Sequence, residues 1–117
     1  MKLNLIVLKT SRPDELAFFY EQLGLKFEHH KHGSGPLHYS SHIDGVVFEI
    51  YPLPQDKNNA DDTLRIGFTV NGLDDTIKRL KNIGGTITKE PTMTEWGYVS
   101  IIKDPDGRKI ELTDKNI

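Results

Sequence analysis

An internal repeat constrains the fold of this chain more than any other feature of its sequence. Residues 5–14 align without a gap on residues 65–74, so that Ile6 falls on Ile66 at an offset of 60 residues. A second match places residues 44–50 on residues 106–112, at an offset of 62 residues. Self-similarity of this kind indicates one supersecondary unit that is built twice.

The length of the chain suits two small units in one domain. The 117 residues match the commonest size of a single folded domain, and a chain of this length can bury one core. We predict module 1 over residues 1–53, a polar linker over residues 54–62 and module 2 over residues 63–114.

Each module shows the same succession of patterns. A run of alternating apolar residues predicts a strand, a stretch of helical periodicity follows it, and three further strand-like runs are separated by turn signals. Gly24 and Gly84 stand where a left-handed residue commonly ends a helix. The sequence therefore predicts an α+β fold of two βαβββ modules.

The starts of the two helices carry capping signals. Ser11 and Asn71 are good N-cap residues, and Asp14 and Asp74 follow three positions later, as in a capping box. We expect these side chains to cap the two helices.

The strand phases predict one apolar and one mixed face in each sheet. The side predicted to face the helix is apolar throughout, as in Phe48, Ile50, Ile110 and Leu112. The opposite side mixes apolar and charged residues, namely Leu5, Val7, Val47, Glu49, Tyr51, Arg65, Thr69, Lys109, Glu111 and Thr113. Because charges are rarely buried without partners or a purpose, this composition favours a concave ligand cavity over a packed core.

The paired units and the closing run 104–112, Asp-Pro-Asp-Gly-Arg-Lys-Ile-Glu-Leu, resemble the vicinal oxygen chelate superfamily. That superfamily includes glyoxalase I, bleomycin-resistance proteins and extradiol dioxygenases, and the resemblance covers almost the whole chain. It implies the two-module glyoxalase/bleomycin-resistance fold. In the enzymes, the first and last strands of each unit supply ligands to a divalent metal.

Carried over to this chain, the four metal-ligand positions are Leu5, Glu49, Arg65 and Glu111. Leu5 has no donor atom, and Arg65 is a permanent cation that cannot coordinate a metal. We therefore expect no metal and no cofactor, with Arg65 hydrogen-bonded to Glu49, Glu111 or both. Two readings of Arg65 remain open: a partner for these carboxylates, or a contact to an anionic group of a ligand.

Histidines are the remaining metal candidates, and all five lie between residues 29 and 42: His29, His30, His32, His38 and His42. A site that combines His38 or His42 with Glu49 is one interpretation. An exposed histidine-rich hairpin is the other, and we prefer it because clusters without a motif give many false positives. His38 is also a candidate acid or base if it lines the cavity.

Aromatic residues complete the candidate site. Tyr51 shares the predicted face of Glu49, and Trp96 and Tyr98 stand at the start of a predicted strand. Either these three rings stack on a planar ligand, or they serve ordinary packing or a dimer interface.

Composition excludes several classes of function. The chain has no cysteine, so thiolate catalysis, disulfides and thiolate metal sites are absent. A formal net charge of −2 with interspersed signs disfavours nucleic-acid binding. The first residues are too short an apolar stretch for a signal or a membrane span. We expect a cytoplasmic protein with no nucleic-acid or membrane partner.

Two classes of function compete. The preferred one is metal-independent binding or sequestration of a small molecule, planar or cationic, in a cleft between the modules. The ligand-binding residues would be His38, Glu49, Tyr51, Arg65, Trp96, Tyr98 and Glu111. The alternative is a glyoxalase-like lyase or isomerase that uses a divalent metal held by Glu49, Glu111 and a histidine, or one of these carboxylates as a metal-free base. The resemblance also implies a homodimer.

Overall fold

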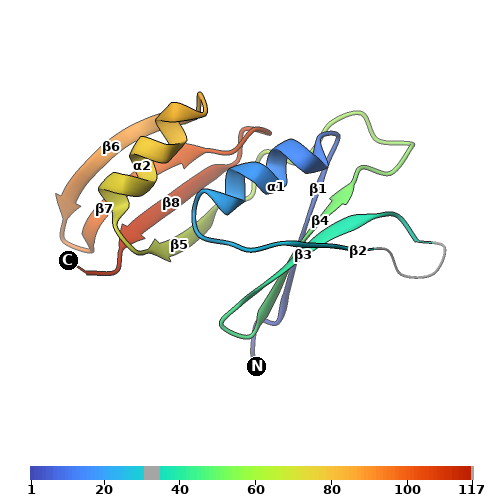
Figure 1. Ribbon diagram of the computed structural model, residues 1–117, viewed down its shortest axis with the longest axis horizontal. Helices are drawn as coiled ribbons and strands as arrows, with labels where there is room; N and C mark the ends of the chain where they lie inside the picture. Colours follow the sequence, from blue (N-terminus) through green and yellow to red (C-terminus); the bar gives the residue numbers. More distant parts are fainter. Residues whose placement is uncertain (31–34, 117) are drawn as a thin grey trace. The chain divides into compact units, whose positions relative to one another are not determined.

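Two βαβββ units follow one another in the computed structural model, which describes residues 1–30 and 35–116 (Figure 1). Unit 1 extends to Asp61 and unit 2 begins at Asp62. The predicted α+β fold of two modules is confirmed. The described helices do not include one that is long and apolar enough to span a membrane.

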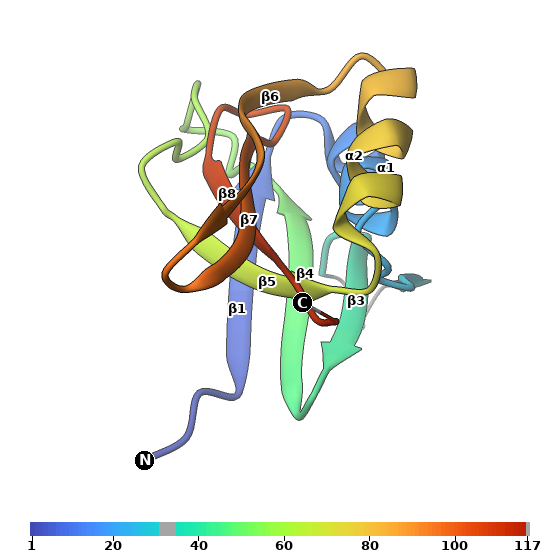
Figure 2. The ribbon, with the colours of Figure 1, turned by 90° about the vertical axis from the view of Figure 1, so that its left-hand side faces the viewer.

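Unit 1 contains a mixed sheet and one helix. Its elements are β1 (Leu5–Thr10), α1 (Pro13–Glu21), β2 (Glu28–His30), β3 (His38–Ile43) and β4 (Val46–Pro52). The strand order is β1-β4-β3-β2, with β1 parallel to β4 and the other pairs antiparallel. Figure 2 shows β1, β4 and β3 side by side.

Unit 2 repeats this topology. Its elements are β5 (Ile66–Val70), α2 (Leu73–Asn82), β6 (Thr86–Thr94), β7 (Gly97–Lys103) and β8 (Lys109–Asp114). The order β5-β8-β7-β6 places the parallel pair β5 and β8 at one edge, as β1 and β4 are placed in unit 1. Figure 1 shows α2 lying across its own sheet.

The predicted strand phases agree with the observed burial. Phe48 and Ile50 in unit 1, and Ile110 and Leu112 in unit 2, are fully buried. The rings of Tyr20 in α1 and Phe48 in β4 pack 5.1 Å apart between centroids. We call the opposite face of each sheet, which points away from its own helix, the distal face.

The helix starts differ from the predicted capping. The residue before α1 is Arg12, and the residue before α2 is Gly72, and neither helix has a side-chain cap from Ser11 or Asn71. The carboxylate of Asp114, at the end of β8, accepts a hydrogen bond from the backbone N–H of Leu73 at 2.8 Å. A partner distant in sequence therefore replaces the local cap in unit 2.

The two acidic residues of the predicted capping boxes have another role. Asp14 accepts a hydrogen bond from the hydroxyl of Tyr39 in β3, and Asp74 accepts one from Tyr98 in β7 at 2.8 Å. Each bond ties the first turn of a helix to the third strand of its own unit. The internal repeat thus extends to this tertiary contact.

A buried ion cluster closes the turn between β7 and β8. The Arg108 side chain is 1 % exposed, and its Nη1 lies 3.1 Å from carboxylate oxygens of both Asp104 and Asp106. The backbone N–H groups of Asp106 and Arg108 donate to Oδ1 of Asp104 at 2.9 and 3.1 Å. These bonds fix the turn that follows Lys103 and precedes Lys109.

Candidate ligand-binding site

Three of the predicted site residues meet on the distal face of unit 1. The His38 side chain is 1 % exposed, and its Nε2 lies 3.4 Å from Oε2 of Glu49, whose side chain is 16 % exposed. The ring of Tyr51 lies parallel to the imidazole, with 4.2 Å between centroids and 7° between planes. The strand pattern alone did not show that these side chains would be in contact.

The register of β3 and β4 explains why these side chains meet. Ser40 is paired with Glu49 in the antiparallel ladder, and Tyr39 with Ile50. Because alternate side chains of a strand share a face, His38 and Ser40 project to the same side as Glu49 and Tyr51. The helix side of the same strands carries the buried Phe48 and Ile50.

The buried imidazole has a defined orientation. Nδ1 of His38 lies 3.2 Å from the carbonyl oxygen of Pro36. Since a carbonyl oxygen can only accept, Nδ1 carries the proton in this bond, and Nε2 is directed toward Glu49. The pair presents one ring nitrogen and one carboxylate oxygen on the distal face.

Sequence reasoning missed two residues of this face, Glu28 and Ser40. The register pairs Glu28 with Ser40 and Ser40 with Glu49, so the two carboxylates lie in one row of the sheet, on either side of Ser40. Adjacent strands are separated by about 4.8 Å, which places the backbones of the two glutamates about 10 Å apart. Only knowledge of the register of β2 could have revealed this row.

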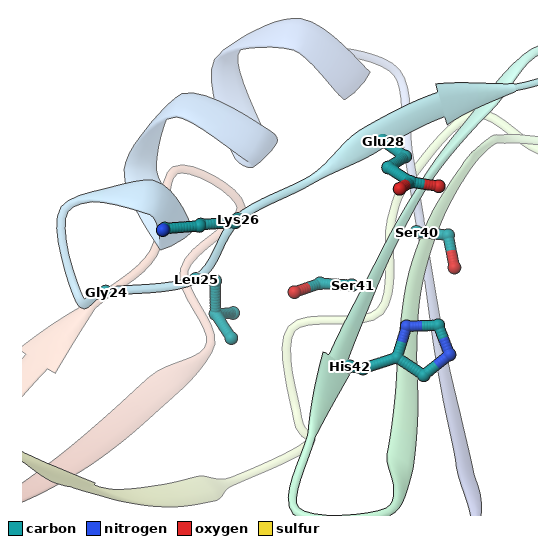
Figure 3. A pocket seen from close by; sticks show the side chains of 7 residues that line it. All are labelled: Gly24, Leu25, Lys26, Glu28, Ser40, Ser41 and His42. Carbon is teal, nitrogen blue, oxygen red and sulfur yellow. The ribbon is translucent and has the colours of Figure 1, made fainter.

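A pocket of about 330 Å³ opens at the edge of β3 (Figure 3). It forms because the chain before β2 diverges from β3. In Figure 3, Ser40 and His42 project to one side of β3, whereas Ser41 projects to the other side, toward Leu25. The lining residues are Gly24, Leu25, Lys26, Glu28, Ser40, Ser41 and His42.

The other histidines do not join the pair of His38 and Glu49. His29 stacks on Tyr39 with 4.0 Å between ring centroids. Because Tyr39 bonds to Asp14 on α1, this stack belongs to the helix side of the sheet. His42 is exposed, the backbone of His30 is paired with that of His38, and His32 lies outside the described residues.

Two predicted residues meet on the distal face of unit 2. Nη2 of Arg65 lies 3.5 Å from Oε2 of Glu111, and their side chains are 60 % and 47 % exposed. The expected contact of Arg65 with a carboxylate is therefore present with Glu111. The two charges are largely hydrated, and exposed ion pairs of this kind contribute little to stability.

Tyr98 and Trp96 lie elsewhere. Tyr98 is on the helix side of β7, where its hydroxyl donates to Asp74. This hydrogen bond to a carboxylate raises the pKa of Tyr98 above its ordinary value. Trp96 lies in the turn between β6 and β7 with 79 % of its surface exposed. Neither ring joins Arg65 and Glu111, because β7 begins at Gly97 and its alternation directs Tyr98 toward α2.

The four positions that hold the metal in the enzymes of the resembling superfamily do not fit a metal ion here. Leu5 presents a hydrocarbon side chain that is 49 % exposed, and the guanidinium of Arg65 lies against Glu111. Over the described part of the chain, histidine, aspartate and glutamate side chains form no group of three or more suited to a metal ion. Of the four positions, only Glu49 in unit 1 and Glu111 in unit 2 have side chains that can coordinate a metal ion.

Comparison with known proteins identifies a family. The family model described as the Glyoxalase/Bleomycin resistance protein/Dioxygenase superfamily matches residues 2–112. Among curated proteins, no sequence matches the chain.

Solved structures with the same fold are numerous. One is described as TnmS3, an antibiotic binding protein from Streptomyces sp. CB03234; its TM-score is 0.71 at 19% identity, over 97% of this chain and 95% of that one. An integron cassette protein from the mobile metagenome of V. cholerae has a TM-score of 0.71 at 23% identity, over 99% and 96% of the two chains. The structure named Oxidase ChaP-H2 has a TM-score of 0.75 at 18% identity, over 96% and 91%. At these identities the likeness concerns the fold alone.

Proposed function

The chain belongs to the glyoxalase/bleomycin resistance protein/dioxygenase superfamily, and we propose that it binds a small planar cation without requiring a metal ion. The observation that carries this proposal is the contact between Arg65 and Glu111. A guanidinium 3.5 Å from one of the two remaining carboxylates repels a divalent cation from it. Glu49 is then the carboxylate that remains for an organic cation.

The chemistry of unit 1 favours a cationic and planar ligand. Glu28 and Glu49 supply two carboxylates to one row of the sheet, and Ser40 between them supplies a hydroxyl. Tyr51 supplies an aromatic ring on the same face, held in place by its stack on the buried His38. Aromatic rings and carboxylates together attract planar cations through stacking, cation–π contact and Coulomb attraction.

A relative with the same fold gives the proposal a precedent. TnmS3 is described as an antibiotic binding protein, and its chain is covered almost completely by this one. We propose binding or sequestration of the same general kind, together with the homodimer and cytoplasmic location expected from the sequence. Trp96, with its exposed indole, then serves either the ligand or the partner chain.

Titration of the full chain with 9-aminoacridine, a planar cation, tests the binding function. We expect saturable binding, followed by the quenching of the dye's fluorescence, in the presence of a chelator. Glu49→Gln keeps the size of the side chain and removes its charge, so it should weaken binding roughly tenfold. Absence of saturable binding by the wild-type chain would refute the proposal.

A matched control separates a local effect from a change in net charge. Glu95→Gln removes the same charge from the turn between β6 and β7, far along the chain from unit 1. It should leave the affinity for 9-aminoacridine within about twofold of wild type. Equal weakening by Glu49→Gln and Glu95→Gln would mean that the dye responds only to net charge.

The pair of His38 and Glu49 supports a second candidate function. A nitrogen and an oxygen 3.4 Å apart are a donor pair that a glyoxalase-like lyase or isomerase would need for a metal or for proton transfer. Under this alternative, Glu49 would be the base or ligand in unit 1 and Glu111 that in unit 2. Metal-stimulated turnover of a hemithioacetal, lost in Glu49→Gln, would favour the enzyme over the binding protein.

A further inference from the structure

Three cationic side chains lie in one row on the distal face of unit 2. Lys103, the last residue of β7, is paired with Lys109, the first residue of β8. Ile102 and Ile110, their neighbours in sequence, are fully buried on the helix side, so both lysines project to the distal face.

Arg65 continues this row on the third strand. The parallel pair of β5 and β8 matches Ile66 with Ile110, and the register one residue earlier sets Arg65 beside Lys109. The contact of Arg65 with Glu111 confirms that its side chain lies on the distal face. We call Arg65, Lys109 and Lys103 the cation row.

The cation row is an unfavourable arrangement for a sheet by itself. Like charges directly opposite one another in an antiparallel pair repel, because their Cβ atoms are only about 4.5–5.5 Å apart. Within the part of the chain that the structure describes, neither Lys103 nor Lys109 has an ion pair or a side-chain hydrogen bond. Among the described residues, Glu111 is the one carboxylate that forms an ion pair with the row, and its partner there is Arg65.

The backbone beneath the two lysines is held rigidly. The turn that joins them is closed by the buried cluster of Arg108 with Asp104 and Asp106, and the backbone N–H of Asp104 donates to the carbonyl oxygen of Arg108 at 3.0 Å. Because Arg108 already binds both aspartates, these carboxylates are directed into the turn rather than toward the lysines. The backbone positions from which Lys103 and Lys109 project are therefore fixed.

We propose that the cation row binds a multiply charged oxyanion, the chemistry shared by phosphate esters and polycarboxylates, as part of a small-molecule ligand. Three strands span about 10 Å, which matches two neighbouring anionic groups rather than a long polyanion. The acidic net charge of −2 disfavours nucleic acid as the source of these phosphates. The inference goes beyond the proposed binding of a planar cation, because it assigns to unit 2 a ligand group of the opposite charge.

Pyrophosphate and citrate are the probes for this site. Isothermal titration of the full chain at low ionic strength should give saturable binding of at least one of them, whereas acetate at matched ionic strength should not bind. Binding of pyrophosphate alone assigns phosphate chemistry, and binding of citrate alone assigns carboxylate chemistry. Saturable binding of neither probe overturns the proposal, as does tighter binding of a duplex oligonucleotide that displaces pyrophosphate.

Substitutions that remove a positive or a negative charge from this face make the test specific to the cation row. Lys103→Gln and Lys109→Gln should each weaken binding roughly tenfold. Glu111→Gln should strengthen it by roughly a few-fold, because it removes the one negative charge in contact with the row. Affinity that does not change in either lysine variant overturns the proposal, and so does weaker binding by Glu111→Gln.

A matched control removes the same charge elsewhere. Lys78→Gln lies on α2, which covers the other side of the sheet, and its affinity should stay within about twofold of wild type. Equal losses in Lys78→Gln and Lys109→Gln would show attraction by net charge only and overturn the site. Failure here is distinguishable from failure of the proposed function, because unit 1 is tested separately with 9-aminoacridine.

Discussion

The guanidinium of Arg65 lies 3.5 Å from a carboxylate oxygen of Glu111, and roughly half of each side chain is in contact with water. In the metal-dependent enzymes that the sequence resembles, both positions supply metal ligands. Here one of them carries a fixed positive charge that neutralises the other. We therefore expect the pair to affect ligand selection more than it affects the stability of the fold.

Substitution of Arg65 should have little effect on stability. Exposed ion pairs contribute about 0–1 kcal/mol, so Arg65→Ala should change the free energy of unfolding by less than about 1 kcal/mol. Urea denaturation of the wild type and the variant measures this difference. A loss of several kcal/mol would show that the pair is buried in solution, for example in a homodimer.

Alanine substitution should lower the stability of the protein far more at His38 than at His42. His38 is almost fully buried and stacks on Tyr51, so His38→Ala should cost about 2 kcal/mol or more through lost packing. His42, an exposed residue of the same strand, should tolerate alanine within about 0.5 kcal/mol. Comparable denaturation midpoints for the two variants would contradict the structural role of His38.

The bond between Tyr39 and Asp14 predicts a pH dependence at the alkaline end. This hydrogen bond to a carboxylate raises the pKa of Tyr39 to about 12. The unfolded chain has a tyrosine pKa near 10, so the contribution to stability is complete below pH 10 and disappears as the pH rises through about 12.

Tyr39→Phe supplies the comparison. Between about pH 10 and pH 12, the wild type should lose more stability than the variant, as measured by thermal unfolding followed by circular dichroism. Parallel curves of melting temperature against pH for the two proteins would contradict the assignment.

Arg108 should be the most costly charged residue to remove. Its alanine variant leaves two buried carboxylates without their cation, and removal of one partner from a buried ion pair typically costs about 3–5 kcal/mol. Lys109 is the next residue in the chain, and its side chain is exposed. Lys109→Ala should therefore change the free energy of unfolding by less than about 0.5 kcal/mol. Similar unfolding free energies for both variants would show that the buried cluster does not stabilise the turn.

The architecture was predictable because it depends on patterns that are local and repeated. Alternation at period two and helical spacing identified the buried faces of Phe48, Ile50, Ile110 and Leu112, and the repeat showed that the unit occurs twice. Helix capping was not predictable from local residues, because the group that caps Leu73 is Asp114, 41 residues later in the chain.

The candidate site was predictable only in part. Glu49 and Tyr51 share a face as the strand phases predicted, but the contact of His38 with both depends on the register of β3 and β4. For Tyr98 the sequence left ligand stacking and ordinary packing both open, and only the observed register of β7 places its ring on the helix side, because a shift of one residue exchanges the two faces of a strand.

Metal analysis, together with dye binding after chelation, tests whether ligand binding requires a metal ion. Gently purified, tag-free protein would be analysed for metals, and its affinity for 9-aminoacridine would be measured before and after dialysis against EDTA. We expect no stoichiometric metal and the same dissociation constant in both preparations. A stoichiometric metal that disappears in Glu49→Gln, with dye binding lost on chelation, would contradict this expectation.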